Sequence, residues 1–259
     1  MKNIMKSQLY QLKKSSLVRI VFFCVLIMQM ILVMGEMDFF TSNITAGTYV
    51  ALNGNVLIFV SLMFALVFTG ETCGADFLDK TSNYELMGGH LRKEVYFGKA
   101  FLSLGIGTLG TLILNAVPIV FAVSVAGWGS EVEVFDIILR YFLSVFPILR
   151  LICEFIFISY VVKNSYVVMA AGVVISLAGS GWTEFFPNGC AKFSSLGTLC
   201  GLFDLPRWET YTLVGEKDII VYDAALSAAD VAGTVFWSVL FGVAFLLLGY
   251  WYFKKDDMN

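Results

Sequence analysis

The stretch LVRIVFFCVLIMQMILVMG, residues 17–35, decides the fold class because it holds a single charged residue, Arg19, in 19 positions. A helix needs about 20 apolar residues to cross the hydrocarbon core of a bilayer. Five more segments satisfy this condition, at residues 50–70, 100–125, 135–162, 165–182 and 231–253. Lipid offers no hydrogen-bond partner to the backbone, so each segment is expected to be a helix. The sequence therefore predicts an all-α polytopic membrane protein with six transmembrane helices in one domain, residues 1–259.

The composition supports a membrane environment and excludes several other classes. The chain is 58% hydrophobic and 14% charged, and a soluble domain would expose too much of that apolar surface. A net charge of -3 indicates no partnership with nucleic acid. The five cysteines form no CxxC pair and His90 is the only histidine, which argues against a structural zinc site. The first apolar run is too long for a signal peptide and no cleavage site follows it, so we expect a retained helix.

The distribution of Lys and Arg predicts the orientation in the membrane. With the N-terminus inside, twelve of the 17 basic residues lie in cytoplasmic segments, three lie in outside loops, and Arg140 and Arg150 lie within the fourth span. Cytoplasmic loops carry the excess of Lys and Arg. An even number of spans then places both termini in the cytoplasm, and we expect a multi-pass protein of a bacterial plasma membrane.

Two segments outside the spans have an amphipathic pattern. Residues 1–16 are basic and place Met5, Leu9, Leu12 and Ser16 on one helical face, which predicts a connecting helix along the inner membrane face or only a basic flank. Residues 183–230 alternate aromatic side chains with polar residues and glycine. We expect this outside segment to form an amphipathic hairpin at the interface, either as a lid over an exit path or as an aromatic belt. Within it, Cys190 and Cys200 are candidates for a disulfide or for two buried thiols.

Charges inside the fourth span are candidate functional residues. Arg150 and Glu154 are four residues apart, so their side chains share one helical face and can neutralise each other. Intramembrane charges are expected to line a translocation path or a subunit interface, and the alternative is a structural ion pair. Gln29 in the first span is a milder candidate for the path or the interface, with helix packing as the alternative.

Glycine motifs in the chain do not predict nucleotide binding. Residues 105–110 match G-x-G-x-x-G, but they lie inside a hydrophobic span instead of a strand-to-helix turn. Ser103, Gly107 and Thr111 instead form a small-residue face that lets another helix approach. No Walker-type sequence is present, so any ATP-driven activity needs an ATPase in another chain.

The loop between the second and third spans, residues 71–99, resembles that of the six-helix permeases of ATP-binding-cassette (ABC) exporters, the type-2 permease family. In that family an acidic residue ends the second helix, an amphipathic coupling helix follows, and an aromatic-x-Gly-Lys sequence opens the third helix. Glu71 stands at the first of these positions, and Tyr96-Phe97-Gly98-Lys99 matches the last. The turn at residues 159–164 and the N-terminal connecting helix are also similar to the family.

The resemblance implies a mechanism. In the family, two permease subunits, identical or paralogous, pack together in the membrane above two cytosolic ABC ATPases. The ATPases bind the ATP and magnesium. This chain is therefore expected to be non-catalytic and to have no cofactor of its own. The coupling helix, residues 78–86, would enter a groove on the ATPase. The residues expected to carry coupling are Glu71, Asp76, Phe77, Leu78, Lys80, Tyr84, Glu85, Leu86 and Arg92. Small permeases of this kind export antimicrobial peptides, lantibiotics or drugs, or confer self-immunity, which predicts a hydrophobic or peptide substrate and contact with lipid.

Two other functions remain open on the sequence. One is an ion-coupled carrier that works alone, although the internal repeats and broken helices typical of carriers are not evident. The other is a membrane receptor or immunity protein that binds a peptide through its outside segment and transports nothing. A membrane enzyme is disfavoured, because no nucleophile and base are predicted to lie together at depth.

Overall fold

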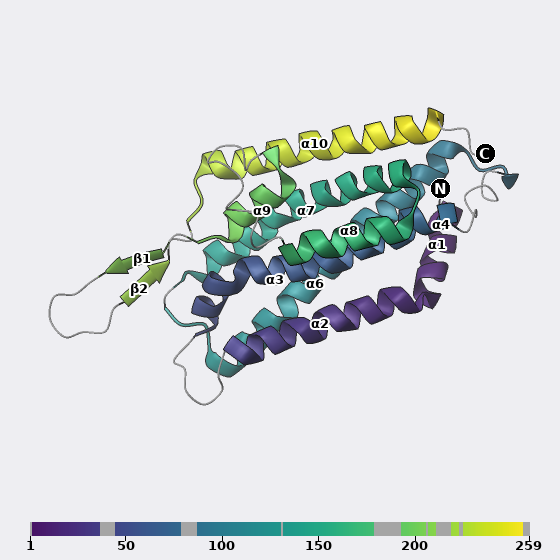
Figure 1. The fold of residues 1–259 in the computed structure, drawn as a ribbon. Coiled ribbons are helices and arrows are strands. Elements are labelled where there is room, and N and C mark those ends of the chain that lie inside the picture. Colours follow the sequence, from purple (N-terminus) through teal and green to yellow (C-terminus); the bar gives the residue numbers. More distant parts are fainter. Residues whose placement is uncertain are drawn as a thin grey trace.

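The chain forms a bundle of long helices with one short strand pair at one end (Figure 1). The computed structural model describes residues 2–36, 45–78, 87–130, 132–178, 193–205, 207–210, 219–222 and 225–255. The helices are α1 (Lys2–Lys14), α2 (Ser16–Glu36), α3 (Ala46–Thr69), α4 (Ala75–Leu78), α6 (Arg92–Ala126), α7 (Val134–Val162), α8 (Ser165–Ala178), α9 (Ser195–Phe203) and α10 (Ala228–Lys255). A π-helix, Gly70–Gly74, continues α3 into α4 without a turn.

Among the described residues, five helices are long and apolar enough to cross a membrane, namely α2, α3 with its π-helical extension, α6, α7 and α10. They agree with five of the six predicted spans. The remaining predicted span, residues 165–182, is not confirmed as one long helix. The described helix there, α8, has 14 residues and is about 21 Å long, which is short of the roughly 30 Å of a hydrocarbon core.

The described helices agree with the predicted all-α fold class, and the outside segment adds one short strand pair to it. Strands β1 (Arg207–Thr210) and β2 (Ile219–Tyr222) pair in an antiparallel sheet, with Arg207 opposite Tyr222 and Thr210 opposite Ile219. This pair extends beyond the end of the bundle (Figure 1). The hairpin predicted for residues 183–230 is therefore partly extended chain, preceded by helix α9.

Helix α3 occupies the centre of the bundle, where small residues of α6 allow close contact. A Cβ atom on Gly110 would overlap the Phe64 ring of α3, and one on Gly107 would approach Ile152 and Ala65. Ser103 and Thr111 on the same side of α6 are fully buried. The predicted small-residue face is thus confirmed as a helix-packing surface. Gly107 and Gly110 of the G-x-G-x-x-G match lie within it, whereas Gly105 has open space around it.

Helix α10 packs along α7 with the same chain direction. A Cβ on Gly242 would lie 3.7 Å from the Cα of Arg150, and one on Gly249 would lie 3.5 Å from the Cα of Phe157. The two contacts are seven residues apart on both helices, so the helices keep their register over two turns. The rest of α10 faces outward, with Phe236, Leu247 and other large apolar side chains exposed, as expected for a surface that contacts lipid.

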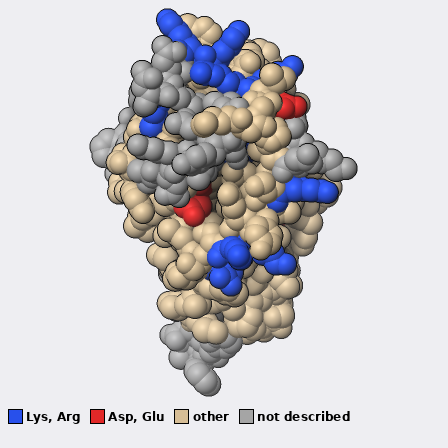
Figure 2. Space-filling view, turned by 90° about the vertical axis from the view of Figure 1, so that its right-hand side faces the viewer, with Lys and Arg blue, Asp and Glu red and all other residues tan. Residues whose placement is uncertain are grey.

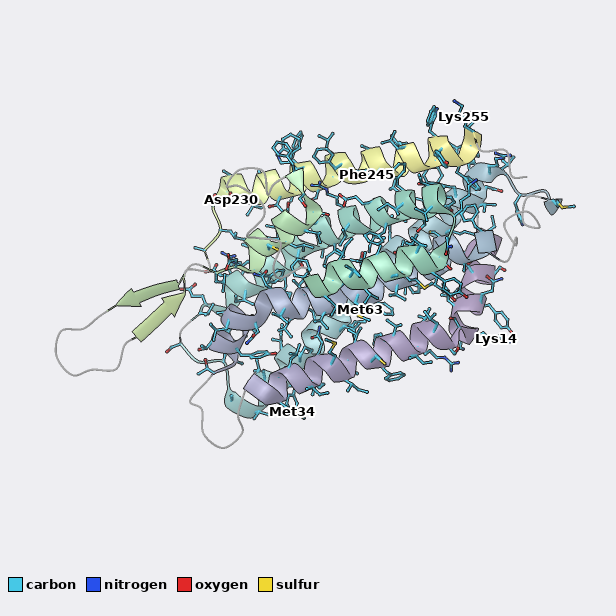
Figure 3. All side chains as sticks on the ribbon, viewed as in Figure 1. Lys14, Met34, Met63, Asp230, Phe245 and Lys255 are labelled. Carbon is cyan, nitrogen blue, oxygen red and sulfur yellow. The ribbon has the colours of Figure 1, made fainter. Side chains whose placement is uncertain are left out.

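The start of α1 and the end of α10 lie at the same end of the bundle. Lys14 and Lys255 mark that end, and Met34 and Asp230 mark the opposite one (Figure 3). Viewed from the former, the surface shows several patches of Lys and Arg (Figure 2). This arrangement is the one that the positive-inside rule expects of a cytoplasmic end.

Helix α1 turns away from α2 across this end (Figure 1). It is a helix as predicted, but the predicted stripe is only partly correct. Ile4, Gln8 and Leu12 are buried against the bundle, whereas Leu9 is half exposed. The face that packs on the protein is therefore rotated from the one that spacing alone selected, because the bundle covers one side of α1 and leaves Leu9 on another.

Candidate functional site

An ion pair lies near the middle of α7. The Arg150 Nε donates to Glu154 Oε1 at 2.9 Å, and the two side chains are 3% and 19% exposed. Arg150 is the seventeenth of 29 residues in α7, close to the midpoint of the span. The pairing predicted from the i, i+4 spacing is confirmed, and its depth makes each charge costly to leave alone.

The pair also holds the beginning of helix α9. The Arg150 Nη2 donates to the carbonyl oxygen of Phe193, and the Ser195 hydroxyl donates to Glu154 Oε2 at 2.8 Å. Ser194 caps the helix by accepting from the Gly197 amide. A carboxylate at the first turn of a helix is favourable because the helix dipole is positive there.

Arg140 holds the other end of α9. Its Nη1 donates to the carbonyl oxygen of Leu202 at 2.5 Å, in the last turn of the helix, where carbonyl groups lack an intrahelical partner. A cation at this end complements the helix dipole. Arg140 itself is 3% exposed. Sequence reasoning placed Arg140 inside a span but assigned it no role.

These contacts fix the direction of α9. It begins at the depth of Arg150 and ends at that of Arg140, so it runs antiparallel to α7. The two arginines are ten residue steps apart on α7, which is about 15 Å along the helix. The nine residues of α9 extend about 14 Å. Helix α9 therefore rises from mid-depth toward the end of the bundle that carries the strand pair.

Helix α8 covers the other half of the same path. Along α3, Gly70 and Gly74 contact α8 near its start, at Met169 and Ser165. Gly54, more than three turns away, contacts Phe203 of α9. Among the described residues, α8 therefore packs along this side in the half near the termini and α9 packs there in the other half. Residues 179–192 between them lie outside the described residues, so the predicted span 165–182 stays a prediction.

Aromatic rings surround the arginine. The guanidinium of Arg150 lies 4.5 Å from the centroid of the Phe241 ring, in cation–π geometry. The Phe193 ring meets Trp237 edge-on at 5.0 Å. A cavity of about 180 Å³ lies beside Arg150, Cys153 and Ser238. Among the described residues, Arg150 Nη1 and the Ser238 hydroxyl are buried without a hydrogen-bond partner. The site thus combines a fixed positive charge, a carboxylate and spare donors at mid-depth.

Gln29 is a packing residue between two spans. Its Nε2 donates to the carbonyl oxygen of Leu57 at 2.8 Å and to the Ser61 hydroxyl at 2.6 Å, and its side chain is fully buried. It therefore links α2 to α3 within the subunit. Neither of these two hydrogen bonds involves Arg150 or Glu154.

The predicted coupling region is described only at its two edges. Glu71 accepts a hydrogen bond from the Ser15 hydroxyl at 3.1 Å, which connects the extension of α3 to the corner between α1 and α2. The Phe77 ring packs edge-on against Tyr160 at 5.5 Å, so it anchors the segment to α7. The side chains of Asp76 and Leu78 and the whole of Lys80, Tyr84, Glu85 and Leu86 lie outside the described residues.

Arg92 opens α6 and joins it to the end of α10. Its Nη1 donates to the carbonyl oxygens of Lys254 at 3.0 Å and Phe253 at 3.3 Å. Tyr96, one turn further, donates to the carbonyl oxygen of Leu246 at 2.9 Å. The ends of α6 and α10 are therefore tied together beside the predicted coupling region.

The predicted disulfide stays a prediction because Cys190 lies outside the described residues. Cys200 is buried in α9, with 1% of its surface exposed. Its position on α9 places any bond to Cys190 next to the helix that Arg140 and Glu154 hold.

Arg140 and Ser195 are the functional residues that sequence reasoning missed. Arg140 carried a usable signal, since an arginine inside a span needs hydrogen-bond acceptors at its own depth. Ser195 gave only a weak signal, because serines are common at helix starts.

The fold and these contacts identify the chain as a multi-pass membrane protein. Among the described residues, no three His, Cys, Asp or Glu side chains gather into a metal-binding group. No family model matches the chain, and no curated protein matches it.

Proposed function

We propose that this chain is the membrane-spanning permease subunit of an ATP-driven ABC exporter in a bacterial plasma membrane. In this proposal two permease subunits form the translocation path, and a hydrophobic or amphipathic substrate, such as an antimicrobial peptide, a lantibiotic or a drug, moves along it. The substrate classes come from the resemblance of residues 71–99 to the type-2 permeases, and the path is supported by the site.

The observation that carries the proposal is the buried Arg150–Glu154 pair in the middle of α7, which holds the start of helix α9 at the same depth. Short helices that begin at mid-depth beside fixed charges are typical of transport sites. Intramembrane charges are costly to bury and are commonly retained for function. Helix α9 is held to α7 by polar contacts at both of its ends, while Leu199 and Leu202 pack in the apolar core. Changes at the buried charges would therefore act directly on both ends of α9.

The cytoplasmic end supports coupling to a partner. Glu71 connects the extension of α3 to the corner of α1 and α2, and Arg92 connects α6 to α10. A force applied to the segment between residues 78 and 92 would therefore reach four spans through direct contacts. The chain has no Walker sequence, so the ATPase in this proposal is a separate cytosolic subunit.

The test is substrate-stimulated ATP hydrolysis in proteoliposomes that contain the chain with its co-purified ATPase, across a panel of lantibiotics. Arg150→Leu is expected to abolish stimulation while basal hydrolysis persists. The matched control is Glu133→Gln, since Glu133 precedes α7, is exposed and makes no side-chain cap contact. Equal stimulation in Arg150→Leu and wild type would contradict a role for the site in transport.

The same buried ion pair also favours a second candidate, an ion-coupled carrier that works alone. In that case Glu154 is the residue that would exchange a proton or hold a cation, and its contact with Ser195 would change with loading. Uptake of substrate by the purified chain under an ion gradient, without ATP or any partner, would select this candidate over the exporter.

A further inference from the structure

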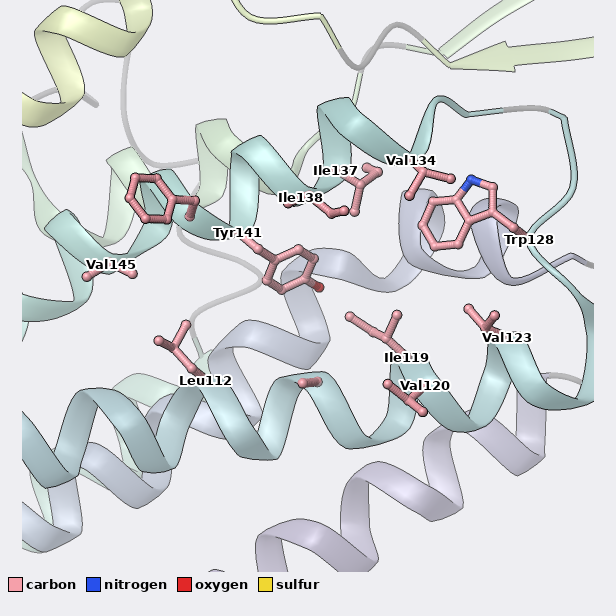
Figure 4. Close-up of a pocket in the computed structure, with 12 residues that line it drawn as sticks. Leu112, Ile119, Val120, Val123, Trp128, Val134, Ile137, Ile138, Tyr141 and Val145 are labelled. Atoms are coloured by element: carbon pink, nitrogen blue, oxygen red, sulfur yellow. The ribbon is translucent and has the colours of Figure 1, made fainter.

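A groove runs between α6 and α7 in the half of the bundle that is distant from both termini. Its volume is about 590 Å³. Leu112 and Val145 line its deep end, and Val123, Trp128 and Val134 line its other end (Figure 4). The rim is open, because Val120, Ile138 and Phe142 are each more than half exposed.

We propose that this groove binds one acyl chain of a membrane phospholipid, from the leaflet opposite the end that carries both termini. The groove is separate from the Arg150 site, and the proposal does not depend on how transport is driven.

The chemistry of the walls selects a hydrocarbon. Every described residue that lines the groove is apolar or aromatic, and none of them carries a charge. The indole Nε1 of Trp128 already donates to the carbonyl oxygen of Val132 at 2.8 Å. The Tyr141 hydroxyl is buried without a hydrogen-bond partner, so it is the one polar side-chain group left for a ligand by the described lining. A charged or strongly polar ligand would lose its hydration and regain at most one hydrogen bond from these side chains.

The length of the groove matches one leaflet. Leu112 to Val123 on α6 and Val134 to Val145 on α7 each cover eleven residue steps, about 16 Å. Half of a hydrocarbon core is about 15 Å thick. Trp128 at the outer end is of the residue type that concentrates at the membrane–water interface, which places that end at the headgroup level.

A helix from a second copy of the chain is the competing occupant, and it is an outcome of the test below. A helix with side chains is about 10–12 Å across. A single hydrocarbon chain is far thinner than a helix and can lie in the groove along its whole length.

The groove also lies next to helix α9. The Tyr141 ring faces the groove and also packs against Phe203 of α9, with 4.8 Å between ring centroids. Its neighbour Arg140 holds the end of α9. An acyl chain in the groove would therefore support the contact between α7 and α9 from the lipid side.

The test is photolabelling of the full-length protein in phosphatidylcholine vesicles that contain a lipid with a diazirine on one acyl chain. We expect at least about fivefold more label per residue in the groove than on the exposed face of α10, which corresponds to a preference of about 1 kcal/mol. Ala116→Phe, which fills the groove, should lower the groove label to the level of α10. Val117→Phe adds a ring at the same depth but outside the groove, and should leave the label unchanged.

A second measurement uses the wild-type protein, so it does not depend on the folding of a variant. A diazirine near the acyl carbonyl should label the Trp128 end, and one at the chain terminus should label the end with Leu112 and Val145. Equal labelling of the groove and α10, or labels that ignore the diazirine position, would overturn the proposal. Cross-links between two copies across the groove, with no lipid label, would assign it to a subunit interface instead.

Discussion

Removing the carboxylate of Glu154 should destabilise the protein more than removing its partner. In Glu154→Leu, the Arg150 guanidinium stays 3% exposed and loses its ion pair, and Ser195 loses its acceptor. Breaking a buried pair by removing one member costs about 3–5 kcal/mol. In Arg150→Leu the stranded carboxyl group can take up a proton, whereas a guanidinium cannot lose one. We therefore expect a cost of about 3–5 kcal/mol for Glu154→Leu and a smaller one for Arg150→Leu.

The assay is reversible unfolding in lipid bicelles, followed by the loss of helical signal. The double variant Arg150→Leu/Glu154→Leu carries no stranded charge, and apolar replacement of a buried pair is often neutral or stabilising. It should therefore unfold closer to the wild type than Glu154→Leu does. Glu133→Gln is the control and should change stability by less than about 0.5 kcal/mol, as exposed substitutions usually do. A Glu154→Leu protein as stable as this control, or a double variant no better than Glu154→Leu, would refute the reasoning.

Two further predictions concern helix packing and the position of α9. Gly110→Ala should lower the free energy of unfolding by about 1–3 kcal/mol, because its Cβ overlaps the Phe64 ring. Gly105→Ala has open space around it and should be neutral or slightly stabilising. Equal unfolding midpoints for the two variants would contradict the packing of α3 on α6. In a chain with no other cysteine, Arg140→Leu should expose Cys200 to a membrane-impermeant maleimide, because the last turn of α9 loses its cation. Arg140→Lys should keep part of the protection of Cys200 from the maleimide. The same protection in Arg140→Leu and wild type would show that Arg140 does not hold α9.

Hydropathy predicted most of the fold, because the thickness of the bilayer sets the length of a spanning helix and an apolar segment of that length can be recognised in the sequence. Five spans agree with the helices within a few residues, apart from α6, which begins at Arg92 instead of residue 100. Helix α9 could not be found in this way. Its nine residues are shorter than any span, and its place depends on Arg140, Arg150 and Glu154, which lie more than 40 residues away in the sequence.

The sequence predicted the Arg150–Glu154 ion pair of the candidate site, but not the groups that the pair contacts on α9. The spacing of Arg150 and Glu154 determines that they can meet on one helical face, whatever surrounds them. Which backbone oxygens and hydroxyls complete the site depends on how a distant segment returns to α7, and local sequence does not encode that return. The stripe on α1 was mispredicted for a related reason, since spacing gives the period of a face but not which side the bundle covers.

The proposed function requires a separate ATPase, and gentle affinity purification of the chain from native membranes is the measurement to make first. We expect a stoichiometric cytosolic ATPase in the purified complex, which is lost when Tyr84 and Leu86 are both replaced by Asp and retained in the control Lys6→Ala. Recovery of the intact chain with no ATPase, or retention of the ATPase in the Tyr84 and Leu86 variant, would contradict it.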